Sequence, residues 1–160
     1  MENQPKVSLI VPVHNAREHL EPCVRSILAQ DHERIEVVLV DDGSSDGSGA
    51  ICDRLAQEDE RIVVIHRPNG GIGSAQNAGL DAMTGEYVTF CDNDDLVSPR
   101  LVSRLLAILT GTGSDMSCCR WENAGESVAA HALRQRRYDE PGRVITFTDP
   151  GSQYQHVFSK

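Results

Sequence analysis

Four apolar runs of strand length alternate along this chain with segments whose apolar residues recur at helical spacing. The predicted strands cover residues 7–13, 35–40, 61–66 and 86–91. The predicted helices cover residues 17–29, a stretch around Ile51 and Leu55, a stretch ending near Ala82, and residues 101–109. Strands separated by helices pair in parallel, with helices on both faces of the sheet. The sequence therefore predicts an α/β fold with a mostly parallel, Rossmann-like sheet, and residues 114–121 are expected to add a fifth strand.

Polar segments follow three of the predicted strands. They are Pro12-Val13-His14-Asn15, Asp41-Asp42-Gly43 and Asp92-Asn93-Asp94-Asp95. A glycine loop over residues 69–74 follows the remaining strand and opens a helix. In an open parallel sheet, ligands bind beyond the carboxyl ends of the strands. The four segments are therefore expected to share one binding edge.

The acidic segment at residues 92–95 gathers three carboxylates directly after a hydrophobic strand. If the backbone stays extended, Asp92 and Asp94 point to the same side. Two converging carboxylates need a cation, or one of them must stay protonated. Oxygen ligands favour a hard ion such as Mg²⁺ or Mn²⁺. The alternative is a solvated acidic turn that caps the next helix.

The other segments admit two interpretations each. Asp42 can accept hydrogen bonds from a nucleotide base or from ribose hydroxyls, or Asp41 and Asp42 can simply cap the following helix, as residues 44–48 are expected to do. The glycine loop can bring backbone amides and a helix dipole to a ligand, or serve only as a turn. His14 by itself fits a packing or capping residue.

Composition narrows the class of protein. The formal charge of −9 argues against nucleic-acid binding. Four of the five cysteines lie in apolar stretches and are expected to be buried in a reducing compartment. No stretch approaches the roughly 20 apolar residues of a membrane span, and no signal peptide is evident. A cytoplasmic location is expected. Peripheral attachment at the inner face of the membrane, through Arg134, Arg136 and Arg137, is the alternative to a solvated charge run.

Five segments, in this order, resemble family 2 glycosyltransferases of the GT-A fold. They are residues 7–15, 40–46, 69–79, 85–87 and 90–95. The resemblance implies transfer of a sugar from a nucleotide-sugar, most often a UDP-sugar, to an acceptor hydroxyl with inversion. It also implies a Mn²⁺ or Mg²⁺ cofactor, a glycan or lipid-linked acceptor, and a place in polysaccharide or glycan biosynthesis.

The resemblance also assigns roles to individual residues. The nucleotide-binding residues it implies are Pro12, Val13, His14, Asn15, Asp41, Asp42, Gln76, Asp92 and Asn93. Asp94 is implied as the main metal ligand, with Asp92 beside the ribose or the metal. Two positions depart from the family pattern: His14 stands where Tyr or Phe is usual, and Gln76 stands where Arg is common.

The pattern of strands and helices fades after Trp121. Residues 1–121 are therefore expected to form the nucleotide-sugar-binding core. Residues 122–160 are expected to begin an acceptor-side region that is incomplete or partly disordered, and no convincing catalytic base follows Asp95. A non-catalytic nucleotide-sugar-binding module is the main alternative. A phosphoacceptor signalling domain is disfavoured because the only lysines, Lys6 and Lys160, do not follow a predicted strand.

Overall fold

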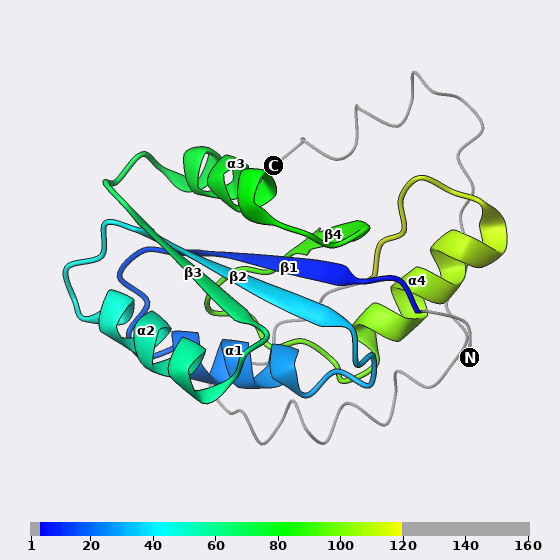
Figure 1. Cartoon of the computed structure of the whole chain (residues 1–160), viewed down its shortest axis with the longest axis horizontal. Coiled ribbons are helices and arrows are strands. Elements are labelled where there is room, and N and C mark those ends of the chain that lie inside the picture. The colour runs from blue at the N-terminus through cyan, green and yellow to red at the C-terminus, as the bar shows by residue number, and fades with distance from the viewer. Residues whose placement is uncertain (1–3, 120–160) are drawn as a thin grey trace. The chain divides into compact units, whose positions relative to one another are not determined.

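The computed structural model describes residues 4–119 and contains alternating strands and helices (Figure 1). The elements are β1 (Val7–Val13), α1 (Leu20–Leu28), β2 (Ile35–Asp42), α2 (Ser48–Glu58), β3 (Ile62–Arg67), α3 (Ile72–Ala82), β4 (Tyr87–Phe90) and α4 (Leu101–Thr112). The strands form one sheet in the order β3-β2-β1-β4, and every neighbouring pair is parallel. The predicted α/β fold with a parallel sheet is confirmed.

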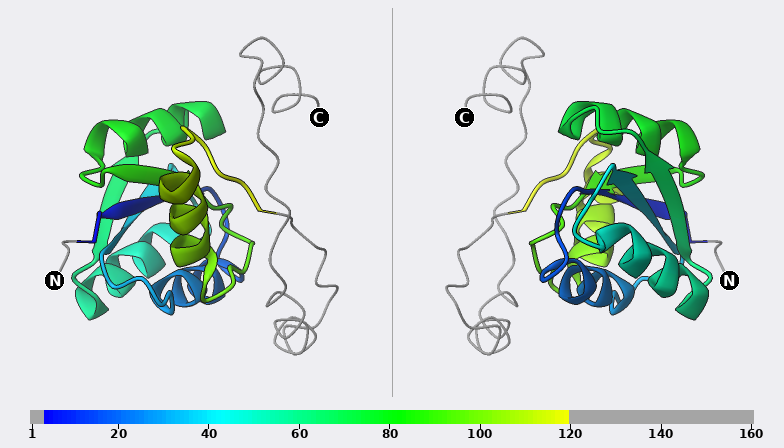
Figure 2. Two further views of the ribbon diagram at one scale, coloured as in Figure 1. Left: turned by 90° about the vertical axis from the view of Figure 1, so that its right-hand side faces the viewer. Right: turned by 90° about the vertical axis from the view of Figure 1, so that its left-hand side faces the viewer.

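Helices cover both faces of the sheet, with α1 and α2 on one side and α3 on the other (Figures 1 and 2). Successive side chains of a strand point to opposite faces. Leu9 and Val11 of β1 accordingly pack in the larger apolar cluster with α1 and α2, whereas Ile10 packs in a smaller cluster with Ala75 of α3. Because both faces are covered, the whole of β1 and β2 is buried, which explains their almost continuous apolar sequences.

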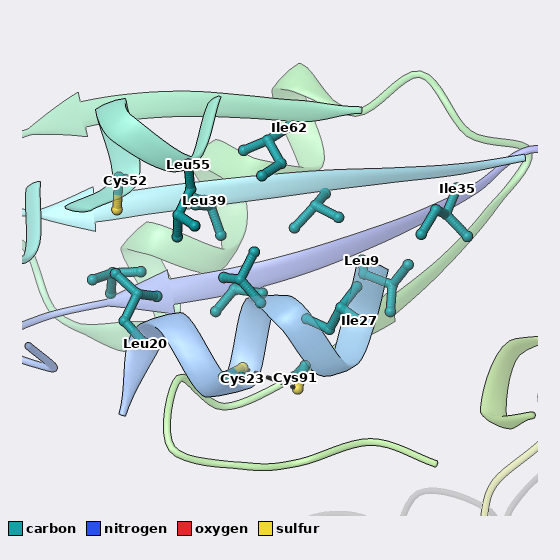
Figure 3. Close-up of a cluster of buried hydrophobic side chains, with 14 of the residues drawn as sticks. Leu9, Leu20, Cys23, Ile27, Ile35, Leu39, Cys52, Leu55, Ile62 and Cys91 are labelled. Atoms are coloured by element: carbon teal, nitrogen blue, oxygen red, sulfur yellow. Dashed lines mark hydrogen bonds between the residues drawn. The ribbon is translucent and has the colours of Figure 1, made fainter. Parts of the chain in front are cut away.

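The larger cluster fills the space between the sheet and α1 (Figure 3). Four apolar side chains of α1 are fully buried at helical spacing: Leu20, Cys23, Val24 and Ile27. Burying a side chain of this size contributes roughly 1.5–3 kcal/mol. This apolar stripe therefore fixes α1 against β1 and β2, and with it the loop that joins β1 to α1.

On the opposite face, α3 lies unusually close to β1. A Cβ atom added at Gly79 would come within 2.4 Å of Cγ2 of Ile10. Any residue with a Cβ atom at this position would require the strand or the helix to move. Gly79 therefore sets the spacing between α3 and the sheet.

A buried polar cluster ties the sheet to the segment that precedes β4. The carboxylate of Glu36, on β2, accepts hydrogen bonds from the Ser8 hydroxyl at 2.7 Å and from the Thr84 amide at 2.8 Å. The ammonium group of Lys6 lies 2.7 Å from the same carboxylate. Although burial alone would raise the pKa of Glu36, its bonds to Lys6, Thr84 and Ser8 outweigh that effect and lower the pKa to about 2. The cluster keeps a buried charge satisfied.

Two predictions about elements are wrong. The first helix begins at Leu20 rather than Arg17, because the chain first forms a turn in which the His19 amide donates to the Ala16 carbonyl at 3.0 Å. The fifth strand predicted over 114–121 is not formed over 114–119, because this segment pairs with no strand of the sheet; residues 120–121 lie outside the described range. Cys118 and Cys119 are consequently exposed, whereas the other three cysteines are buried.

The predicted boundary at residue 121 stays a prediction, because residues 120–160 lie outside the described range. Within residues 4–119, no helix is long and apolar enough to cross a membrane.

Candidate functional site

The carboxyl ends of the strands meet at one edge of the sheet. Val13 of β1 is the register partner of Asp41 on β2, which in turn is the partner of His66 on β3. The fourth strand joins the same edge, because the Cys91 amide donates to the carbonyl of Ile10 at 3.0 Å. We call this edge the rim. The segments that follow all four strands meet there.

The loop after β1 presents its polar residues to solvent. Pro12 and Val13 are buried, whereas His14 and Asn15 are exposed. Asn15 has a left-handed backbone, with φ of 51°. This conformation is uncommon outside glycine, and here the backbone amide of Asn15 donates to Ser44 Oγ at 3.1 Å while its side-chain oxygen accepts from the Ser45 amide at 2.8 Å.

The imidazole of His14 is held on the rim by three neighbours. Its Nδ1 lies 2.9 Å from the carbonyl oxygen of Asp42, which can only accept, so this nitrogen carries the proton. Its Nε2 then accepts from the side-chain amides of Asn15 at 3.2 Å and Asn69 at 3.3 Å. A ring fixed in this way offers an exposed flat surface at the rim.

One side chain of the turn at residues 44–48 caps the start of α2, in line with the prediction: Oδ1 of Asp46 accepts from the amide of Ser48, the first residue of α2, at 2.9 Å. The N-cap residue itself is Gly47, which has no side chain that could cap the helix. Side chains of the same turn also bind the loop after β1, whose amides lack partners in a helix or a strand. Ser48 Oγ accepts from the Ala16 amide at 2.9 Å, and an Asp46 carboxylate oxygen accepts from the Arg17 amide at 3.0 Å.

Asp41 and Asp42 point to opposite faces of the sheet, as adjacent strand residues must. Asp41 faces α2: Oδ1 accepts from the Ser44 amide at 3.0 Å, and Oδ2 lies 2.9 Å from Nδ1 of His66. Burial alone would raise the pKa of Asp41, but the hydrogen bonds from Ser44 and His66 outweigh it and hold the pKa below its usual value. Asp41 is therefore a buried, ionised carboxylate behind the rim.

Asp42 faces α3 and anchors the glycine loop. Its carboxylate accepts hydrogen bonds from the amide of Gly70 at 3.0 Å and from the amide of Gly71 at 2.8 Å. Nε of Arg67 lies 3.1 Å from Oδ1 of the same group. These two loop amides are thus already bound to Asp42, which is buried. The prediction that the glycine loop opens a helix is confirmed, since α3 begins directly after Gly71.

Arg67 is a rim residue that the sequence reasoning did not single out. Its guanidinium group also donates to the hydroxyl of Ser74 at 2.7 Å and to the carbonyl of Ser74, in the first turn of α3. Arg67 therefore joins β2, β3 and α3 at one point. The signal available in the sequence was a basic residue that closes a strand immediately before the glycine loop. Gln76, predicted for the donor site, lies one turn into α3 and is half-buried.

The acidic segment forms a turn rather than an extended strand. The strand β4 ends at Phe90, and the amide of Asp95 donates to the carbonyl of Asp92 at 3.1 Å. The prediction that Asp92 and Asp94 alternate along an extended backbone is therefore wrong. The side chain of Asn93 fixes the turn, because its amide donates to the carbonyl of Pro12 at 2.8 Å.

The carboxylates of this turn create a negative field at the rim. Asp92 and Asp94 are exposed. The pKa of Asp95 is raised, first by burial and then by the charges of Asp92 and Asp94. Among residues 4–119, no group of three or more His, Cys, Asp or Glu side chains is placed to hold a metal ion. Two exposed carboxylates nevertheless fit a Mg²⁺ or Mn²⁺ ion, which commonly takes one or two protein carboxylates and completes its shell with substrate phosphates and water.

A cavity of about 260 Å³ lies away from the rim, between β4 and α4. Its lining includes Val7 and Tyr87, at the amino ends of their strands, together with Leu105 and Met116. It therefore does not belong to the candidate site.

Comparison with known proteins agrees with this fold. The family model described as glycosyl transferase family 2 matches residues 8–158, and the chain belongs to this family. Glycosyltransferase GlyG of Streptococcus pneumoniae serotype 4 is 38% identical over 122 residues, which cover 76% of this chain and 40% of GlyG. The chain thus spans well under half of that relative.

Two solved structures are similar over the core. S. aureus TarS 1–349 in complex with UDP-GlcNAc is 27% identical, with a TM-score of 0.64 over 74% of this chain and 37% of that one. The mannosyltransferase PcManGT from Pyrobaculum calidifontis, in complex with GDP-Man and Mn²⁺, is 31% identical, with a TM-score of 0.55 over 59% of this chain and 29% of that one.

Proposed function

We propose that this chain supplies the donor half of a transferase that moves a sugar from a nucleotide-sugar, most simply a UDP-sugar, to an acceptor hydroxyl with inversion. One observation carries the proposal. The bond from Asn93 to the carbonyl of Pro12 holds the acidic turn beside the loop that carries His14 and Asn15. A nucleoside on the exposed His14 and Asn15 would therefore direct its phosphates along the rim toward Asp92 and Asp94.

The proposed cofactor is Mn²⁺ or Mg²⁺, with Asp94 as the main protein ligand and Asp92 beside it. Burial raises the pKa of Asp95 first, and the charges of Asp92 and Asp94 raise it further; a cation at this turn would offset those two charges. A bound divalent ion stabilises the charge that develops on the departing diphosphate. The complexes of TarS with UDP-GlcNAc and of PcManGT with GDP-Man and Mn²⁺ support the same ligand classes.

The remaining rim residues take roles that follow from their contacts. Pro12 and Val13 form the floor beneath His14 and Asn15, and Asn93 orients the acidic turn. Asp42 is proposed to shape the base pocket through the glycine loop that it holds; a direct bond to a base would require its carboxylate to exchange an existing partner. Asp41 supports the pocket from behind, and Gln76 is proposed to contact the donor, where it would add no charge.

We assign no catalytic base and derive no acceptor. A glycan or lipid-linked acceptor and a role in glycan biosynthesis are proposals from the family alone. A binding-only module is the alternative function. Assay of sugar transfer by a longer chain separates the two, because a binding-only module forms no product with any acceptor.

Calorimetric titration of UDP with and without Mn²⁺ tests the donor site. We expect metal-dependent binding that falls at least tenfold, or about 1.4 kcal/mol, in Asp94→Ala. Asp81→Ala is the matched control, because Asp81 is an exposed carboxylate of α3 outside the rim. Equal affinity of the wild type and Asp94→Ala would remove Asp94 from the metal site, and absence of UDP binding in the wild type would overturn the proposed function.

A further inference from the structure

The imidazole of His66 lies between two carboxylates. Its Nδ1 is 2.9 Å from Oδ2 of Asp41, on β2, and its Nε2 is 2.9 Å from Oδ1 of Asp53, on α2. An ionised carboxylate can only accept hydrogen bonds. Both contacts therefore form together only when both ring nitrogens carry hydrogen, that is, when His66 is an imidazolium ion.

The surroundings of His66 favour that charged form. Asp41 from β2 and Asp53 from α2 contact His66, and Cys52 of α2 lies close enough to both aspartates to feel their charges. Arg67, the next residue of β3, points to the opposite face toward Asp42. The hydrogen bonds that His66 donates to Asp53 and Asp41 raise its pKa above the usual value. Cys52 does not compete for the proton, because burial and the charges of the two aspartates raise its pKa to about 12.

The site is shaped to hold the carboxylate of Asp41 in one place. A Cβ atom added at Gly49, in the first turn of α2, would come within 2.6 Å of Oδ2 of Asp41 and 3.5 Å of Cε1 of His66. Glycine at this position therefore leaves the space that the pair occupies. The start of a helix also carries a partial positive charge that favours a carboxylate.

A chain of hydrogen bonds connects this pair to the nucleoside loop. Oδ1 of Asp41 accepts from the amide of Ser44 at 3.0 Å. The hydroxyl oxygen of Ser44 accepts from the amide of Asn15 at 3.1 Å. Asn15 holds a left-handed backbone and is an exposed polar residue of the loop after β1. The position of Asp41 thus sets the position of Ser44, and Ser44 supports Asn15.

We propose that His66, in its imidazolium form, is a positioning residue of the donor site that holds Asp41 in place and, through Ser44, supports the loop that carries Asn15. This inference rests on the proposed function. When His66 loses its proton, one ring nitrogen presents a lone pair to a carboxylate oxygen, and that contact breaks. Donor affinity therefore falls as the pH rises through the pKa of His66, although His66 does not touch the donor.

The dissociation constant of UDP with Mg²⁺, measured between about pH 6 and pH 9, tests the proposal in the wild type and in His66→Gln. Protonation of UDP affects both dissociation constants equally, so its effect cancels in their ratio. We expect the wild type to bind roughly fivefold more tightly at low pH, a typical size for coupling between sites. The ratio should approach one at high pH, whereas a ratio that does not vary with pH would overturn the proposal.

Two further variants separate positioning from general stability. Asp53→Asn removes a charge that favours the imidazolium, and Asp53 lies on α2 outside the rim, so the midpoint of the affinity profile should move to lower pH. His19→Gln alters an exposed histidine at the start of α1 and should reproduce the wild-type profile. An unchanged midpoint in Asp53→Asn would contradict the proposed bridge.

NMR titration of the ligand-free protein distinguishes failure of this inference from failure of the proposed function. The C–H resonance of His66, identified by its loss in His66→Gln, should titrate above the usual value, and the Ser44 amide shift should follow the same midpoint. A Ser44 amide that does not respond would overturn the inference even where UDP binds. A Ser44 amide that responds in a protein that binds no UDP would retain the structural link while the proposed function falls.

Discussion

The side-chain amide of Asn93 donates to the carbonyl of Pro12 at 2.8 Å, and this bond ties the turn after β4 to the end of β1. The two residues lie 81 positions apart in the sequence. Pro12 lacks an amide hydrogen but keeps a carbonyl that can accept. The bond joins the metal-binding part of the proposed donor site to its nucleoside-binding part.

Asn93→Leu, which removes the donor at similar volume, should weaken metal-dependent UDP binding. Loss of one hydrogen bond costs about 1 kcal/mol, which corresponds to roughly a fivefold weaker affinity. Calorimetry with Mn²⁺ provides the measurement. Gln57→Leu, the same change of amide to leucine at an exposed position of α2, is the control. Unchanged affinity in Asn93→Leu would show that the turn keeps its position without this bond.

Gly79→Ala should destabilise the fold by about 2 kcal/mol, because the added methyl group overpacks a tight contact. The methyl group would meet Ile10 of β1, an inner strand of the sheet, at 2.4 Å. Urea unfolding measures the change. Gly73→Ala, in the same helix, is the matched control, since a Cβ at Gly73 meets nothing within 4 Å. That variant should gain up to about 1 kcal/mol from higher helix propensity, and an equal loss in both variants would contradict the packing argument.

Arg67→Met should loosen the glycine loop while leaving the sheet intact. The guanidinium group contacts both Asp42 and Ser74, so its loss removes the link between β3 and the first turn of α3. Hydrogen exchange of the amides at residues 70–74 should become faster by about tenfold, as expected for the loss of roughly 1.4 kcal/mol of local stability. The amides of α2 serve as an internal control, and uniform acceleration in both regions would indicate global destabilisation instead.

The order of strands and helices could be predicted because each element carries its own local pattern. The continuous apolar run of β1 indicated a strand buried on both faces, and both clusters do contain its side chains. The prediction failed at residues 114–119, where a few apolar residues resembled a strand. A strand is defined by its hydrogen-bonded neighbour, and a local pattern does not contain that information.

The candidate site at the rim, too, could be predicted only in part. The placement of Asp42 and of the acidic turn after their strands followed from the general rule for parallel sheets. The hydrogen-bond partners of these residues could not be predicted in this way, because the partner of each residue depends on the register between strands. His66 meets Asp41 across 25 residues and Asp53 across 13. The turn at Asp92 also could not be distinguished from an extended segment, since its closing bond joins backbone atoms and leaves little trace in the side chains.

The stability of the fold should depend on pH through Glu36. Its pKa in the folded protein is lowered from 4.5 to about 2 by Lys6, Thr84 and Ser8, against the opposing effect of burial. A carboxyl group whose pKa is lowered by folding stabilises the folded state above its unfolded pKa. This contribution should therefore be complete at neutral pH and be lost as the pH falls from 4.5 toward 2.

Glu36→Gln isolates this contribution. At pH 7 the substitution should cost about 3 kcal/mol of unfolding free energy, because it leaves the Lys6 ammonium without its buried partner. Urea unfolding of the wild type and the variant at several pH values should show the difference shrinking as acid protonates Glu36. Glu33→Gln, at an exposed position before β2, should change stability little at any pH. A difference between the wild type and Glu36→Gln that stayed constant down to the acid limit would mean that the loss comes from packing, and that the charge of Glu36 does not stabilise the sheet.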